Sequence, residues 1–146
     1  MILARSATEQ DLPNLISVAQ RFVEDTDLNF TFDPDITVST LKGFIENERT
    51  IFLLGEYESV IMGAILGIVD RDFCVEYSAY ISKMYIEKEF RGLGAARMLV
   101  QAFEREALRM GASKIFASST AGMGERVENL YVNLFKRFKF FFNVHF

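Results

Sequence analysis

Two glycines, Gly92 and Gly94, stand between a β-rich run and an amphipathic segment, and this junction constrains the fold more than any other feature. The run before them, residues 77–86, is rich in β-branched and aromatic residues, which favours a strand. After them, apolar residues recur at helical spacing over 95–110, and a further β-rich run follows at 114–119. A strand, a helix and a strand in this order form a parallel crossover, so the sequence predicts an α/β fold.

The remaining sequence has strand and helix patterns on both sides of this junction. Apolar residues at helical spacing predict helices, and apolar runs beside polar turns predict strands. In chain order we expect a strand at 2–5, a helix that follows Thr8 and fades at 25–27, a loop at 28–35, a helix at 38–47, a hairpin of 51–57 with 60–69, a helix at 125–135 and an extended tail at 138–146. Gly63 and Gly67, inside the second strand of the hairpin, indicate a bulge or the close approach of another backbone.

Composition narrows the class of protein. The chain has 146 residues, half of them hydrophobic and a quarter charged, which predicts a single globular domain over 1–146. Its net charge of −4 argues against a dedicated nucleic-acid binder. No apolar run reaches the roughly 18 residues of a membrane span, and the first residues do not resemble a signal peptide. We therefore expect a cytoplasmic protein with no membrane partner.

One cysteine and one histidine leave few options for metal binding or nucleophilic catalysis. Cys74 alone cannot form a disulfide within the chain or a cysteine-rich zinc site, and we expect a small, reduced core residue there. A triad with a histidine would depend on His145, the penultimate residue. The sequence therefore predicts neither a metal site nor a triad.

The glycine junction itself has the chemistry of an anion site. A helix N-terminus presents unpaired backbone N–H groups and partial positive charge, and small residues let an anion approach them. Arg91 and Arg97 add two full charges. A dinucleotide-binding fingerprint would need a glycine or alanine where Arg97 stands, and the Gly-Lys-Ser/Thr of a P-loop is absent. What remains is Arg91-x-x-Gly94-x-Ala96, a pattern that alone also fits a simple strand-to-helix turn.

In its context, after Met84-Tyr-Ile86, this pattern resembles the phosphate-binding motif of the GNAT family of N-acetyltransferases. The resemblance covers nearly the whole chain. It continues in Thr8-Glu-Gln-Asp-Leu-Pro-Asn-Leu, in the stretch from Gly55 to Gly63, and in Arg126-Val-Glu-Asn-Leu-Tyr131-Val-Asn-Leu134. It implies the family's acyl-CoA N-acyltransferase fold, an α/β fold with a mixed, mostly antiparallel central sheet flanked by helices.

The resemblance also implies where acetyl-CoA binds. By position, the backbone of Met84 and Ile86 pairs with the pantetheine arm, beside a cleft where two strands separate and the acetyl thioester lies. The pyrophosphate is expected at the turn and the first helical residues, which are Arg91, Gly92, Leu93, Gly94, Ala95, Ala96 and Arg97. Because the strand contacts involve main chain, the side chains of Met84 and Ile86 remain free to pack in the core.

Tyr131 matches the tyrosine that serves many family members as general acid and protonates the departing CoA thiolate. The family commonly has Gly-Phe shortly after this tyrosine, where this chain has Phe135 and Lys136. A second alignment therefore puts Phe135 at the tyrosine position, which leaves no acid, and simple packing in a helix is the third interpretation of Tyr131. For the general base, Glu76 is a candidate beside the plainer hypothesis of a solvated loop acid, and a role for Cys74 near the thioester stays open.

The resemblance implies an enzyme that moves acetyl from acetyl-CoA to a primary amine by direct attack. The alternative is a catalytically inactive module of the same fold that binds CoA or a protein partner. The amine, of a small molecule or a protein, is expected against the first two helices, near Asp25, Asp27, Asn29, Phe30 and Phe32. Acids there would favour a cationic amine, unless they are only solvated acids at a helix end.

The C-terminal tail predicts contact with another chain. Alternation in an extended tail puts five apolar residues on one face: Phe138, Phe140, Phe142, Val144 and Phe146. Phe141 then lies on the opposite face, where a late edge strand would expose it. We expect a homodimer through this strand, and the alternative is that the last helix covers Phe141 within one subunit.

Overall fold

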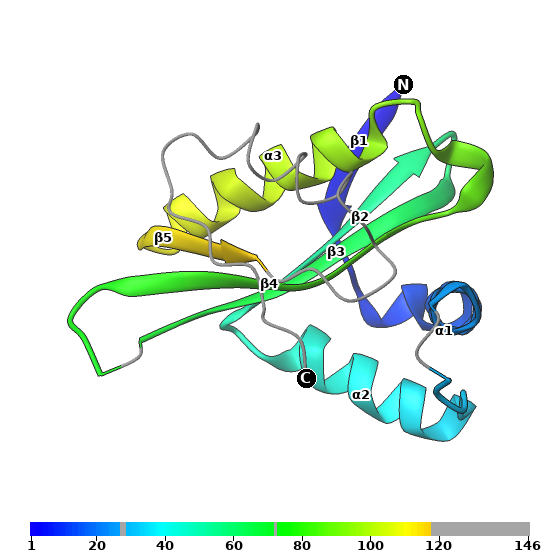
Figure 1. Cartoon of the computed structure of the whole chain (residues 1–146), viewed down its shortest axis with the longest axis horizontal. Helices are drawn as coiled ribbons and strands as arrows, with labels where there is room; N and C mark the ends of the chain where they lie inside the picture. The colour runs from blue at the N-terminus through cyan, green and yellow to red at the C-terminus, as the bar shows by residue number, and fades with distance from the viewer. Residues whose placement is uncertain (27–28, 72, 118–146) are drawn as a thin grey trace.

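A five-stranded sheet in the order β1-β2-β3-β4-β5 forms the centre of the molecule (Figure 1). The computed structural model describes residues 1–26, 29–71 and 73–117. The strands are β1 (Ile2–Ser6), β2 (Thr50–Tyr57), β3 (Val60–Asp70), β4 (Tyr77–Ile86) and β5 (Ala112–Ala117). Pairs from β1 to β4 are antiparallel and β4 pairs with β5 in parallel, so the predicted mixed, mostly antiparallel sheet is confirmed.

Helices cover both faces of this sheet (Figure 1). They are the short 3-10 turns η1 (Glu9–Asp11) and η2 (Lys88–Phe90), and the α-helices α1 (Leu12–Asp25), α2 (Pro34–Glu46) and α3 (Ala95–Arg109). On the α3 face the core includes Ile65, Leu99 and Phe103, whereas the opposite core joins Leu15 of α1 and Leu41 of α2 to the sheet. Burial of each large apolar side chain contributes about 1.5–3 kcal/mol to the free energy of folding. The cores on both faces of the sheet therefore hold the helices against it.

Two element boundaries differ from the sequence-based expectation. α2 begins at Pro34, four residues earlier than expected, because Asp33 caps it: the backbone N–H of Ile36 donates to the Asp33 carboxylate at 2.8 Å. β5 begins at Ala112 instead of 114, since Gly111 adopts φ +91° and ends α3 directly before the strand. The expected helix at 125–135 and tail at 138–146 lie outside the described residues.

The glycines of β3 confirm the predicted close approach and bulge. A Cβ at Gly67 would lie 2.3 Å from the Tyr80 carbonyl oxygen, too near for any side chain. Opposite this position β4 is irregular, because Ile81 pairs with Gly67 and Lys83 with Leu66. One extra residue, Ser82, therefore stands in β4 at a β-bulge.

The expectation of a buried Cys74 is wrong. Cys74 is exposed, in a bend between β3 and β4 that also leaves Phe73 and Val75 exposed. Four residues of this bend precede Tyr77, where β4 begins, so they extend past the sheet, and none of the helices in the described ranges packs over them. Within the described ranges no helix is long and apolar enough to cross a membrane.

Candidate functional site

β4 extends past the part of β5 that the structure describes. Their parallel pairing is described as far as Ile81 and Ala117, one residue before the bulge at Ser82. From Lys83 to Ile86, β4 stays paired with β3 on its other side. Among the described residues, the second edge of β4 therefore has no strand partner over this segment.

The backbone of Met84 and Ile86 faces this edge. The N–H of Glu87 donates to the Met62 carbonyl oxygen at 2.8 Å, which makes that pair a hydrogen-bonded one. Antiparallel ladders alternate, so Tyr85 points its backbone N–H and C=O toward β3, whereas Met84 and Ile86 point theirs away from it. The Met84 side chain is nevertheless buried in the core under α3. The two interpretations of Met84, core residue and backbone partner, are therefore geometrically compatible.

The turn after η2 is open to an approaching group. Gly92 and Gly94 adopt φ +80° and +86°, and a Cβ on either would meet nothing within 4 Å. α3 starts at Ala95, with Gly94 as its N-cap and a 3.1 Å bond from the Met98 N–H to the Gly94 carbonyl. The first N–H groups of this 15-residue helix have no acceptor within the helix. Together with the exposed Arg97, they make the turn electropositive.

Arg91 points away from the helix N-terminus. Its Nε donates to the Ile86 carbonyl oxygen at 2.9 Å, and its Nη2 donates to Oδ2 of Asp25 at 3.2 Å. The guanidinium also lies over the Tyr85 ring, 5.6 Å from its centroid. The resemblance placed Arg91 among the CoA residues, and the structure places its side chain between the end of β4 and α1.

Asp25, the last residue of α1, gathers three donors. The Tyr85 hydroxyl donates to it at 2.6 Å and Lys88 Nζ lies 3.0 Å from its Oδ1, in addition to the bond from Arg91. The hydrogen bond from Tyr85, followed by that from Lys88, lowers the pKa of the Asp25 carboxyl below its usual range. Burial, followed by the bond to Asp25, raises the pKa of Tyr85, so its hydroxyl stays protonated as a donor. Asp25 is thus not the unpaired acid that would attract a cationic amine.

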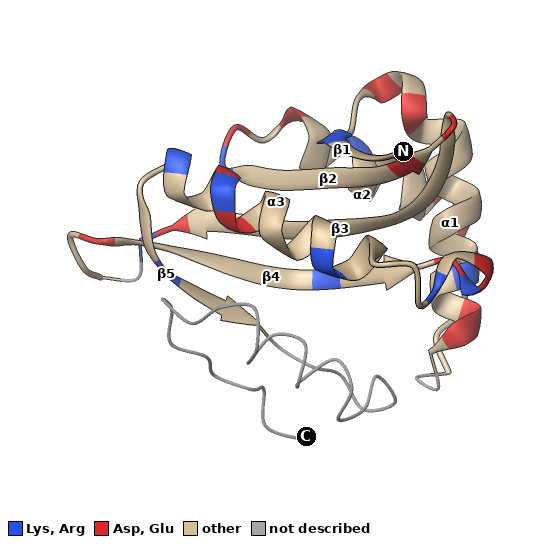
Figure 2. Ribbon diagram, turned by 90° about the horizontal axis from the view of Figure 1, so that it is seen from above, with Lys and Arg blue, Asp and Glu red and all other residues tan. Residues whose placement is uncertain are grey.

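A second ion pair lies one turn earlier on α1. Arg21 Nε donates to Glu87 at 2.7 Å, and Glu87 is only 4% exposed. The Phe22 ring packs edge-on against Tyr85, with centroids 5.8 Å apart. Figure 2 shows acidic and basic residues side by side where α1 meets the segment before α3. The polar clusters around Asp25 and Glu87 therefore both connect α1 with the end of β4.

No local sequence pattern indicates these contacts, because the partners are far apart in the chain. Tyr85 and Asp25 are separated by 60 residues, and Arg21 and Glu87 by 66. A helix face and a strand end carry no local pattern that marks such a pair.

The proposed catalytic residues are placed as follows. Tyr131 and Phe135 lie outside the described residues. Glu76 is exposed at the start of β4, six residues and about 20 Å along the strand from Ser82. Glu76 and Cys74 therefore lie far along β4 from Met84 and Ile86, and the roles suggested for them as base or near the thioester stay predictions.

The cavity found among the described residues lies away from the turn. No group of three or more His, Cys, Asp or Glu side chains in the described part of the chain could hold a metal ion. A cavity of about 180 Å³ lies between α2 and β2, lined among others by Phe44, Ile45 and Phe52. None of the residues expected to bind CoA lines it, so it is distinct from the candidate site.

Comparison with protein families gives a match that covers most of the chain. Residues 15–135 match the model of the acetyltransferase (GNAT) family. This protein therefore belongs to the GNAT family of acetyltransferases, as the motif around Arg91 and Gly94 indicated. A comparison with curated proteins finds no match.

Solved structures share the fold at low sequence identity. A predicted acetyltransferase from Clostridium acetobutylicum, solved with acetyl-CoA, is 22% identical with a TM-score of 0.75, over 90% of this chain and 88% of that one. An aminoglycoside acetyltransferase from an uncultured soil metagenomic sample, in complex with sisomicin, is 16% identical with a TM-score of 0.77, over 99% and 93%. A ribosomal-protein-alanine N-acetyltransferase from Brucella melitensis biovar Abortus 2308 is 12% identical with a TM-score of 0.75, over 92% and 90%. These three structures resemble this chain in fold.

Proposed function

We propose that this protein transfers an acetyl group from acetyl-CoA to a primary amine, as a single domain over 1–146 acting in the cytoplasm. The observation that carries the proposal is the edge of β4 that has no strand partner among the described residues, beside an open glycine turn. The edge offers the backbone of Met84 and Ile86 to a pantetheine arm. The turn offers the N–H groups of 92–97 to a pyrophosphate. The family match supports this use of the site.

In the proposed reaction the amine nitrogen attacks the thioester carbonyl, the new C–N bond forms and the C–S bond breaks. A lysine-like amine is mostly protonated at pH 7, and losing that proton costs about 4–5 kcal/mol. Asp25 and Glu87 are both engaged in ion pairs, so neither is offered as the base. Tyr131 is proposed to protonate the departing thiolate.

The acceptor is proposed to approach along α1 and α2, on the side where Phe22 and Tyr85 pack together. The names of two proteins of similar fold mention different amines, an aminoglycoside in one case and a ribosomal-protein alanine in the other. Those names leave both small-molecule and protein amines as candidate classes.

A thiol-release assay with acetyl-CoA and a panel of amines tests the proposal. We expect turnover with at least one amine and a loss of at least 100-fold in kcat for Tyr131→Phe, with acetyl-CoA affinity retained. Tyr57→Phe, an exposed tyrosine at the end of β2, is the matched control and should keep wild-type kcat. Acetyl-CoA binding without turnover on any amine would instead favour an inactive CoA-binding module.

We also propose a homodimer through the C-terminal strand, on the argument that Phe141 falls on its outer face. Sedimentation at micromolar concentration should give a dimer, and Phe141→Lys should give a folded monomer. A wild-type monomer, or a dimer that Phe141→Lys leaves intact, would overturn this part of the proposal.

A further inference from the structure

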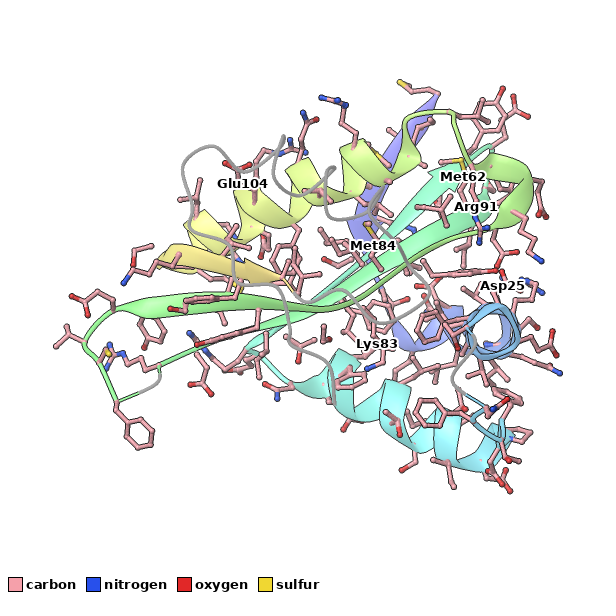
Figure 3. All side chains as sticks on the ribbon, in the orientation of Figure 1. Asp25, Met62, Lys83, Met84, Arg91 and Glu104 are labelled. Carbon is pink, nitrogen blue, oxygen red and sulfur yellow. The ribbon has the colours of Figure 1, made fainter. Side chains whose placement is uncertain are left out.

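Lys83 lies near the C-terminal end of β4. It is the first residue beyond the bulge at Ser82, and it lies past the part of β5 that the structure describes. Its strand partner is Leu66, whose side chain belongs to the core beneath α1 and α2. Figure 3 accordingly shows Lys83 on the side of β4 that faces α2, and Met84 on the side that faces α3.

The Lys83 side chain is exposed and makes no ion pair or side-chain hydrogen bond with residues in the described ranges. Two carboxylates at this end of β4, those of Asp25 and Glu87, are already engaged. Asp25 faces both Lys88 and Arg91, so that cluster carries excess positive charge, and Glu87 is paired with Arg21. Among the described residues, the side of the site proposed for the acceptor therefore has an ammonium without an ion-pair partner beside two acids that are paired.

A cationic lysine in this place discriminates between amines by their other charges. Like charges repel, so a polyamine whose remaining amines are protonated would be disfavoured beside Lys83. An amine that also carries a carboxylate would gain a charge-assisted contact that orients its nitrogen toward the edge of β4. The contact leaves the chemistry unchanged: nitrogen gains the acetyl group and loses a proton, and the CoA sulfur gains one.

We propose that Lys83 binds a carboxylate of the acceptor, so that the acceptor is a primary amine bearing a carboxylate and not a polycationic amine. This inference rests on the proposed acetyltransferase function and names its substrate class. Of the two acids expected to favour a cationic amine, Asp25 is neutralised by its partners, and Asp27 lies outside the described residues.

Matched amine pairs test the proposal: the members of a pair differ in carboxylate against carboxamide, and kcat/KM is referred to the unprotonated amine, because a carboxamide lowers the pKa of a neighbouring amine. Suitable pairs are alanine with alaninamide, phenylalanine with phenylalaninamide, and γ-aminobutyrate with its amide, and sisomicin serves as the polycationic amine. We expect the wild-type kcat/KM to favour the carboxylate member of at least one pair tenfold or more. Lys83→Gln should bring that ratio within about twofold of unity, and Lys83→Glu should reverse it.

Lys114→Gln is the control, because it removes the same charge from β5, opposite Ser78 near the far end of β4. It should keep the wild-type ratio, and all three variants should keep the wild-type affinity for acetyl-CoA. Wild-type preference for carboxamides or sisomicin would overturn the inference, and so would a carboxylate preference that Lys83→Gln leaves unchanged.

Calorimetry separates this inference from the proposed function. If no amine in the panel releases thiol, the proposed function fails, and the CoA-loaded protein is titrated with the same pairs. Tighter binding of the carboxylate members that Lys83→Gln abolishes would still support the role of Lys83. Equal binding of both members, or no binding of either, would overturn it.

Discussion

The Tyr85 hydroxyl donates a 2.6 Å hydrogen bond to Oδ2 of Asp25, which joins the end of β4 to the last residue of α1. The same carboxylate holds Lys88 and Arg91, and Arg91 in turn bonds the Ile86 carbonyl. One acid therefore connects the helix that borders the proposed acceptor side with the segment that leads into the proposed pyrophosphate turn. This arrangement has measurable consequences for stability.

Asp25→Asn should lower the free energy of unfolding by about 1 kcal/mol, because the amide keeps the size of the side chain but loses both ion pairs. For a chain of this length that corresponds to a Tm lower by about 2–4 °C. Glu48→Gln, which neutralises an exposed acid with no contact in the described residues, is the control and should leave Tm unchanged. In 1 M salt the difference should shrink, since screening then acts over about 3 Å. Equal Tm values for both variants would contradict the assigned role of Asp25.

Two glycine-to-alanine substitutions should have opposite effects on stability. A Cβ at Gly67 would lie 2.3 Å from the Tyr80 carbonyl oxygen and 2.6 Å from the Phe103 ring, so Gly67→Ala should cost about 2 kcal/mol or more. Gly43 lies inside α2 with nothing within 4 Å of its Cβ position, so Gly43→Ala should add about 0.5–1 kcal/mol. Urea unfolding measures both. A Gly67→Ala variant as stable as wild type would show that β3 and β4 are farther apart than described.

Acid should weaken the fold through Asp11. Arg5 donates to this carboxylate at 2.7 and 2.9 Å, and these bonds are the main cause that lowers the pKa of Asp11 from 3.8 to about 2. A carboxyl whose pKa is lower in the folded state than in the unfolded state stabilises the folded state at pH values above its unfolded pKa. This contribution to the free energy of unfolding disappears as pH falls from about 4 to about 2. Because Arg5 is partly exposed, we expect a loss of about 1–2 kcal/mol. Asp11→Asn should be less stable than wild type at pH 6 and should lose less between pH 4 and pH 2; parallel pH curves for the two proteins would contradict the assignment.

The sequence predicted those features that local patterns determine. The strand, glycine turn and helix around Gly94 follow from hydrophobic spacing, and the bulge beside Gly67 follows from a glycine inside a strand. The start of α2 was missed because Pro34 and Asp33 were interpreted as loop residues, although together they form a helix start. The cluster around Asp25 depends on tertiary contact across 60 residues, for which a single sequence carries no local pattern.

Two sequence-based predictions still depend on residues beyond the described ranges. They are the role of Tyr131 as general acid and the exposure of Phe141 at a dimer interface. The error at Cys74 has a different origin. Composition favours burial of a lone cysteine, but the bend at 73–76 extends past the sheet, where no core is available to it.

The central claim is that the turn from Gly92 to Arg97 binds the pyrophosphate of acetyl-CoA, and calorimetric titration of Gly94→Glu tests it most directly. The carboxylate would lie at the N-terminus of α3, where a second anion is expected to bind. Gly111→Glu is the matched control, because it imposes the same positive-φ strain, φ +91°, at the other end of α3. We predict that Gly94→Glu lowers the affinity for acetyl-CoA at least tenfold, about 1.4 kcal/mol, while Gly111→Glu binds like wild type. Wild-type affinity in a folded Gly94→Glu variant would contradict the account.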